Sequence, residues 1–170
     1  MESKFRLRPL EAKDAPGMLE WMTDPAIARF FRFDAAKMTL AGCEAFIAGA
    51  GEQRDCRHWC IAGGDDEYLG TISLKEIRNG EAEYAISTRA KAHGTGAAME
   101  ATRQLLELAF GELGLKRVYL NVLADNGRAN AFYRKAGFRF THTEKAALTI
   151  RGETKDLNWY EIGKEDYDRE

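Results

Sequence analysis

The chain has 170 residues, of which 45% are hydrophobic and 31% are charged. This is the composition of an ordinary globular protein, and the length favours one domain over residues 1–170, large enough to bury a hydrophobic core. The formal net charge of −2 provides no overall attraction to nucleic acid or to an anionic membrane.

The apolar runs and the cysteines indicate the compartment. No apolar run approaches the length of a membrane span, and the residues from Met1 to Lys4 do not begin a signal peptide. Cys43, Cys56 and Cys60 are odd in number and share no ligand spacing with the histidines, so neither a disulfide framework nor a zinc site is expected. We therefore predict a cytoplasmic protein with reduced thiols, no metal, and no membrane or nucleic-acid partner.

The first quarter of the chain predicts one strand and three helices. Residues 5–10 alternate in polarity around Pro9, which is typical of an edge strand. Helices are predicted over 11–22, 26–30 and 39–50, from apolar residues at helical spacing and from capping residues at their starts.

A meander of three antiparallel strands follows. Residues 58–62 and 68–74 predict a hairpin around the glycines and aspartates of 63–66. Asn79-Gly80 then turns the second strand into a third strand over 82–87.

The remaining elements complete the sheet. They are a helix over 97–113, a strand over 117–122, a short helix over 128–135, a strand over 138–141, a loop or bent excursion over 143–152, a strand over 154–162 and a charged, frayed tail over 164–170. Antiparallel strands joined to a parallel partner through a crossover helix predict a mixed α/β sheet with helices on its faces.

A turn with two glycines joins the third strand of the meander to the long helix. Gly94 and Gly96 stand one residue apart, and Ala97 and Ala98 begin the helix at once. Backbone N–H groups at a helix N-terminus point outward, and with the helix dipole behind them they form an anion site, usually for phosphate. Glycine permits positive φ and close approach of a ligand. On the glycines alone, a turn chosen only for its geometry is an equal alternative.

Three patterns together resemble the GCN5-related N-acetyltransferase (GNAT) superfamily. They are Gly94-Thr95-Gly96-Ala97 with Glu100, Leu120-Asn121-Val122 with Asn126, and the run from Ala131 to Phe138. The resemblance is strong over about residues 81–140, and the N-terminal half more weakly resembles the branch of ribosomal-protein alanine and amino-sugar acetyltransferases. It implies a mostly antiparallel central sheet flanked by helices, whose central parallel strand pair is splayed to hold a cofactor. It also implies that acetyl-CoA is the co-substrate and that the acetyl group moves to a primary amine within a ternary complex.

The resemblance assigns residues to this cofactor. The pyrophosphate would lie on the backbone amides of 93–98, and the pantetheine arm would lie along 85–87. The expected cofactor-binding residues are Ala85, Ile86, Ser87, Lys91, His93, Gly94, Thr95, Gly96, Ala97, Ala98, Asn121, Asn126, Ala129, Phe132 and Lys135. Lys91 stands where the family usually has Arg or Gln, so a cation is kept but the planar geometry is lost. Asn126 can also cap the short helix.

Acyl transfer to an amine needs a neutral amine, donors to the developing oxyanion and a proton or hydrogen bond for the leaving thiolate. Tyr133 matches the family's tyrosine near the sulfur and is the expected general acid, since a phenol with an unperturbed pKa near 10 is protonated at neutral pH. Glu83 is the candidate base, acting through water, with a solvated strand carboxylate as an equal alternative. The backbone N–H of Ile86 or Ser87 would face the oxyanion.

The acceptor is less constrained by the sequence. The resemblance places Trp21, Phe30, Phe31 and Arg32 in one wall of the acceptor pocket, although core aromatics are the alternative interpretation. A protein N-terminal amine, an amino-sugar nucleotide and a polyamine all remain open as acceptors. A non-catalytic sensor of CoA or acyl-CoA is the alternative function, and a homodimer through the last strands is suggested by family analogy.

Overall fold

The computed structural model describes residues 4–31 and 37–169 of the chain. The strands are β1 (Arg6–Pro9), β2 (Arg57–Ala62), β3 (Tyr68–Arg78), β4 (Glu81–Thr88), β5 (Arg117–Leu123), β6 (Arg139–Ile150) and β7 (Glu153–Gly163). The helices are α1 (Ala15–Thr23), α2 (Pro25–Ala28), α3 (Leu40–Gly49), α4 (Ala97–Glu107, continued as a π-helical segment over Leu108–Glu112), α5 (Gly127–Lys135) and α6 (Lys164–Asp168). None of the helices in this part of the chain is long and apolar enough to cross a membrane.

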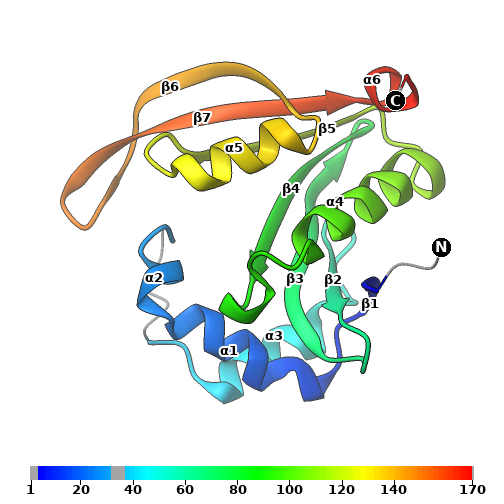
Figure 1. Cartoon of the computed structure of the whole chain (residues 1–170), viewed down its shortest axis with the longest axis vertical. Coiled ribbons are helices and arrows are strands. Elements are labelled where there is room, and N and C mark those ends of the chain that lie inside the picture. Colours follow the sequence, from blue (N-terminus) through cyan, green and yellow to red (C-terminus); the bar gives the residue numbers. More distant parts are fainter. Residues whose placement is uncertain (1–3, 32–36, 170) are drawn as a thin grey trace.

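The strands of the described residues form one seven-stranded sheet in the order β1-β2-β3-β4-β5-β7-β6. Among these strands, β4 and β5 are the parallel neighbours and the other pairs are antiparallel. Helices flank the sheet (Figure 1). The predicted mixed α/β sheet, mostly antiparallel with a central parallel pair, is confirmed.

The two faces of the sheet bury separate hydrophobic clusters. Ile61 of β2 belongs to the cluster under α4, whereas its neighbours Cys60 and Ala62 belong to the cluster under α1 and α3. Successive side chains of a strand point to opposite faces, so α4 covers one face and α1 with α3 covers the other. Leu105 of α4 and Met18 of α1 are fully buried in these two clusters.

Residues 143–152 were predicted as a loop or bent excursion; the loop is wrong, because residues 143–150 belong to β6, and the bend is present as a shift of register. β6 continues to Ile150 and pairs with β7 as far as Glu153. A shift of register between Glu144 and Leu148 bends the strand, and in this stretch Asp156 Oδ1 accepts a hydrogen bond from the backbone N–H of Ala146 at 2.8 Å. Most side chains of β6 are exposed, so the strand lacks the polar–apolar alternation that identifies a half-buried strand.

The predicted frayed tail over 164–170 is also wrong, because Lys164–Asp168 forms the short helix α6. Asp166 accepts a hydrogen bond from the backbone N–H of Gly163 at 3.3 Å at the start of the helix. The ring of Tyr167 packs against Phe110 with centroids 5.2 Å apart. These contacts hold the charged tail against the end of the α4 segment.

The parallel pairing of β4 and β5 is short. It covers three residue pairs, from Glu81–Arg117 to Glu83–Tyr119, although β4 runs on to Thr88 and β5 to Leu123. Figure 1 shows the two strands separating beyond this point, while β4 stays paired with β3. The predicted splay is therefore confirmed, and within the described residues the β5-facing edge of β4 has no strand partner after Glu83.

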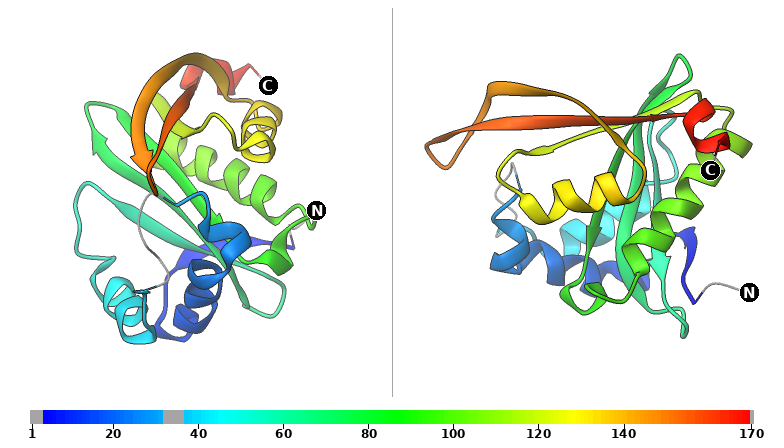
Figure 2. Two further views of the ribbon diagram at one scale, coloured as in Figure 1. Left: turned by 90° about the vertical axis from the view of Figure 1, so that its left-hand side faces the viewer. Right: turned by 45° about the horizontal axis from the view of Figure 1, so that its top comes forward.

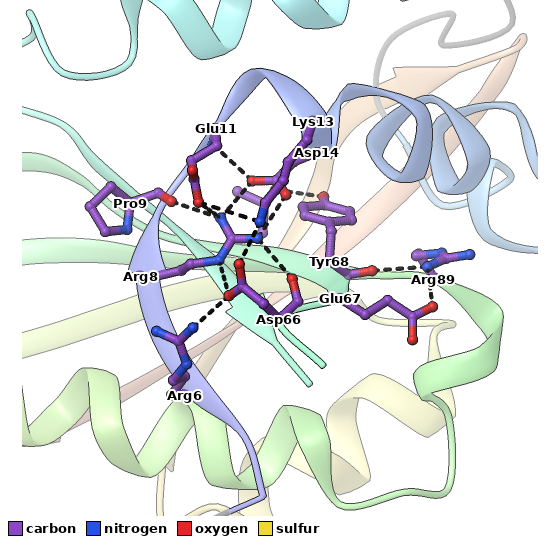
Figure 3. A network of polar contacts seen from close by, with 11 residues as sticks. Arg6, Arg8, Pro9, Glu11, Lys13, Asp14, Asp66, Glu67, Tyr68 and Arg89 are labelled. Atoms are coloured by element: carbon purple, nitrogen blue, oxygen red, sulfur yellow. Dashed lines mark hydrogen bonds and ion pairs between the residues drawn. The ribbon is translucent and has the colours of Figure 1, made fainter. Parts of the chain in front are cut away.

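Ion pairs of the buried Arg8 join β1 to Asp14, just ahead of α1, and to Asp66 at the tip of the β2–β3 hairpin (Figure 3). The Arg8 guanidinium donates two hydrogen bonds to the Asp14 carboxylate, at 2.9 and 2.8 Å, and a third from Nε to Asp66 Oδ1 at 2.7 Å. The Arg8 and Asp14 side chains are 7% and 1% exposed. Hydrogen bonds from Lys13 and Arg8 lower the pKa of Asp66 to about 2. The same hairpin contacts Arg89, just ahead of the glycine turn.

Candidate active site

The glycine turn, residues 93–96, directly precedes α4. Gly94 has φ +77° and Gly96, the N-cap of α4, has φ +88°. Thr95 Oγ1 donates to Ala92 O at 2.6 Å and accepts from the Ala97 N–H at 3.2 Å, so the side chain braces the turn from within. A Cβ at either glycine would meet no atom within 4 Å. The glycines are therefore required by backbone conformation, and the turn is open where a phosphate would approach the N–H groups.

Replacing Gly96 with alanine should strain the turn. A residue with a Cβ in the left-handed region costs about 1–2 kcal/mol, so we expect that loss in the free energy of unfolding, measured in urea. If the turn binds the cofactor, the Kd for CoA should also rise about tenfold. Gly111→Ala is the matched control, because Gly111 has open space around its Cβ and no positive φ. Equal effects at Gly96 and Gly111 would contradict the requirement for positive φ.

The segment ahead of the turn is clamped by Arg89. Its guanidinium donates to both carboxylate oxygens of Glu20 on α1, at 2.8 and 2.9 Å, and to Glu67 Oε1 at 3.0 Å and Tyr68 O at 2.9 Å. The Glu20 pKa is lowered by these hydrogen bonds. Lys91 forms an ion pair with Glu67. The predicted cation of the turn is thus held at the β2–β3 hairpin, and its contact with a phosphate stays a prediction.

Glu83 of β4 and Tyr133 of α5 lie on opposite faces of the sheet. Glu83 Oε1 accepts a hydrogen bond from Asn121 Nδ2 of β5 at 3.2 Å. Tyr84, the next residue of β4, points to the other face, where its ring lies 5.8 Å from that of Tyr133. A carboxylate–amide pair therefore lies on one side of the splay, and a phenol lies on the other.

Aromatic rings surround Tyr133. Its ring centroid lies 5.4 Å from that of Phe132, 6.0 Å from Phe138 and 6.1 Å from Tyr160. Burial in this environment raises the pKa of Tyr133 to about 12. The phenol therefore stays protonated at any ordinary assay pH, and it is a weaker acid than its unperturbed pKa suggests.

Helix α5 and its N-cap carry further residues that were predicted to bind the cofactor. Asn126 caps the helix by accepting a hydrogen bond from the Ala129 N–H at 3.3 Å, which confirms its structural role. Ala129 packs against the core cluster under α4, and Lys135 is exposed at the opposite end of the helix. Burial and the nearby charge of Arg128 lower the pKa of His93, so the glycine turn and the start of α5 share one electrostatic environment.

The predicted acceptor aromatics separate into two environments. Trp21 is buried, donates from Nε1 to the Tyr68 hydroxyl at 2.8 Å, and packs edge-on against Phe31 with centroids 5.5 Å apart. Phe30 instead lines a pocket of about 320 Å³ between the end of α2 and the β6–β7 hairpin. Arg32 lies outside the described residues.

The β6–β7 hairpin forms one side of this pocket. Figure 2 shows the hairpin projecting toward α2. At its tip, Arg151 donates hydrogen bonds to Arg29 O at 3.1 Å and to Ala28 O at 3.2 Å. Asp125 and Lys155, which form an ion pair at 2.7 Å, also line the pocket. Apolar, cationic and anionic side chains thus share its wall.

Three residues of this region were not found from the sequence. They are Arg89, Arg128 and Asn130. Arg128 had a usable signal, because a cation in the first turn of a helix opposes the helix dipole and suggests another role. Arg89 and Asn130 had none, since their partners lie on elements distant in the sequence.

The chain is similar in sequence and in fold to known acetyltransferases. A sequence model described as an acetyltransferase (GNAT) domain matches residues 4–139. Spermidine N(1)-acetyltransferase of Escherichia coli (strain K12) is 26% identical over 135 residues, which cover 78% of this chain and 72% of that protein. The structure of spermidine N-acetyltransferase from Vibrio cholerae in complex with CoA and spermine superposes with a TM-score of 0.88 at 21% identity, over 98% of this chain and 99% of that one. The ribosomal L7/L12 alpha-N-protein acetyltransferase RimL in complex with CoA gives 0.85 at 16% identity, over 95% of both chains. The two structures share the fold.

Proposed function

Because the chain belongs to the acetyltransferase (GNAT) domain family and is an N-acetyltransferase, we propose that it transfers the acetyl group of acetyl-CoA to a primary amine of a polyamine. The observation that carries the proposal is the splay of β4 and β5, with Tyr133 on one face and Glu83 with Asn121 on the other. An amine and a leaving sulfur on opposite sides of an acyl carbon need two polar groups placed in this way.

The cofactor side would be held by the glycine turn and the free edge of β4. The positive φ of Gly94 and Gly96 leaves the turn open toward the N-terminus of α4, where backbone N–H groups and the helix dipole favour phosphate. Ala85, Ile86 and Ser87 lie on the part of β4 that has lost its β5 neighbour, so their backbone can pair with an extended arm as a strand would. Acetyl-CoA bound there would supply the acetyl group as an activated thioester.

Tyr133 and Glu83 would each act on one proton of the reaction. Tyr133 would hold a proton on its hydroxyl and donate a hydrogen bond to the leaving sulfur. With a pKa of about 12 the phenol acts mainly as a hydrogen-bond donor. Glu83 would accept the ammonium proton of the acceptor, directly or through water, and Asn121 would keep the carboxylate oriented.

A polyamine acceptor is supported by two observations. The curated relatives that match over most of the chain are spermidine N(1)-acetyltransferases. Glu83 is half-buried, and its hydrogen bond from Asn121 occupies one carboxylate oxygen. The other oxygen can attract a cationic amine before taking its proton.

A panel of acceptors tests the proposal. Thiol release from acetyl-CoA would be measured with spermidine, an alanine-terminated peptide and an amino-sugar nucleotide, against a blank without acceptor because the chain has three cysteines. Release with spermidine alone is the expected result. Release with the peptide or the sugar nucleotide alone would replace the polyamine by that class, and CoA binding without any release would favour a sensor.

Replacing Glu83 with glutamine should lower kcat/KM for the amine about 10²-fold or more at neutral pH, the usual contribution of a positioned general base. The loss should shrink as the pH rises toward 10, because the free amine then forms without a base. Glu81→Gln is the matched control: Glu81 stands two residues earlier on the same face of β4, paired with Arg117 at 3.3 Å. A loss that is independent of pH, or one shared by Glu81→Gln, would remove Glu83 from the role of base.

A further inference from the structure

Asn130, in the middle of α5, is a buried side chain whose amide uses its full hydrogen-bonding capacity. Nδ2 donates to Leu123 O at 3.1 Å and to Asn126 O at 2.7 Å. Oδ1 accepts from Asn158 Nδ2 at 2.9 Å and from the Tyr160 hydroxyl at 2.7 Å. An asparagine amide offers two donors and about two acceptor positions, and all are occupied here. Because two partners are carbonyl oxygens, the orientation of the amide is fixed by its neighbours.

These four bonds connect the elements around the splay. Leu123 is the last residue of β5, Asn126 caps α5, and Asn158 and Tyr160 lie in β7. Asn158 also accepts a hydrogen bond from Thr143 Oγ1 of β6 at 2.7 Å, which extends the connection by one strand. The Asn130 side chain thus connects α5 to the end of β5 and to β7.

Tyr133 lies on the same face of α5 as Asn130. Residues 126, 130 and 133 follow the spacing of one helix face. Tyr160 joins the two residues directly, because its hydroxyl bonds Asn130 and its ring lies 6.1 Å from the Tyr133 ring. A shift or rotation of α5 would therefore move the Tyr133 hydroxyl and the cap Asn126 together.

We propose that Asn130 is a positioning residue for acetyl transfer: it holds α5 at the depth and rotation that place the Tyr133 hydroxyl at the leaving sulfur. The inference rests on the proposed function for the role of Tyr133. Since a misplacement of about 1 Å can lower a rate about 10²-fold, loss of this fixation should act mainly on kcat. Binding of CoA, to which the glycine turn on α4 contributes, should change less.

The test variant is Asn130→Asp, which keeps the shape and the acceptor oxygen but replaces the two donors by an oxygen facing carbonyls. We expect kcat to fall 10-fold to 100-fold, while the Kd for CoA changes less than threefold. Tyr160→Phe is the milder second variant, because it keeps the ring beside Tyr133 and removes one donor to Asn130, so a smaller loss in kcat is expected. Phe110→Leu, at the far end of the α4 segment, controls for a general loss of packing.

The decisive readout is the combination with Tyr133→Phe. If Asn130 acts through Tyr133, Asn130→Asp should lower kcat little further once the phenol is gone, whereas a general structural defect would multiply the two losses. Crystal structures of the wild type and Asn130→Asp with CoA provide a second readout that needs no acceptor. We expect the Tyr133 hydroxyl to move about 1 Å relative to the glycine turn. Multiplied losses, or an unmoved α5, would overturn the proposal. Absence of transfer in the wild type would refute the proposed function and leave the crystallographic comparison to decide the role of Asn130.

Discussion

Replacing Tyr133 with phenylalanine should lower kcat about 10² to 10⁴-fold, with little change in the Kd for CoA. The ring keeps its packing against Tyr84, Phe138 and Tyr160, and only the hydroxyl is lost. A positioned proton donor commonly contributes a factor of this size. The measurement is the rate of thiol release under saturating acceptor, with CoA binding followed separately by calorimetry.

Tyr167→Phe is the matched control, because it removes the hydroxyl of a tyrosine in α6 whose ring packs against Phe110 of the π-helical segment after α4. The pH dependence provides a second check. Since burial raises the pKa of Tyr133 to about 12, its ionisation should cause no loss of activity below pH 10. A loss below threefold in Tyr133→Phe, or an equal loss in the control, would show that a group other than Tyr133 donates the proton or hydrogen bond to the leaving sulfur.

The parts of the fold that were predictable carry local signals. The glycine turn was recognised because Gly94 and Gly96 directly precede a helical pattern, and the structure gives both a positive φ. The course of β6 was not recognised, because its stability comes from pairing with β7 and from a bulge held by Asp156, and its exposed side chains do not alternate. Strand pairing of this kind depends on the partner more than on the strand's own residues.

The candidate site divides in the same way. Asn126 and Tyr133 belong to two neighbouring sequence patterns from which their roles were predicted, and Asn126 does cap α5. Asn130, four residues later, reads in the sequence as a poor helix former with no evident purpose. Its role emerges only when β7 brings Asn158 and Tyr160 to the same side chain. Local sequence thus indicates a helix cap and a candidate proton donor more readily than the groups that hold them in place.

Replacing Asp14 with asparagine should lower the free energy of unfolding by about 1–3 kcal/mol, because the buried Arg8 loses its bidentate anionic partner and keeps the carboxylates of Asp66 and Glu11. Arg8 keeps Asp66 Oδ1 at 2.7 Å, but it loses the anionic partner that accepts two of its hydrogen bonds. Asp14 also accepts the backbone N–H of Glu11 at 2.8 Å, and asparagine can keep that bond. The loss in the free energy of unfolding should therefore measure the contribution of the Asp14 charge and of its two hydrogen bonds from Arg8.

A double variant separates these contributions. In Arg8→Met combined with Asp14→Asn no buried charge is left unpaired, so part of the stability lost in Asp14→Asn should return, as measured by urea unfolding at pH 7. Lys13→Met removes one of the two exposed cations that pair with Asp66 and should have a much smaller effect than either buried substitution. If the free energy of unfolding of Asp14→Asn lies within about 1 kcal/mol of the wild-type value, the attraction between Arg8 and Asp14 only offsets the cost of their desolvation. The position of β1 against the segment of Asp14 would then depend on packing rather than on charge.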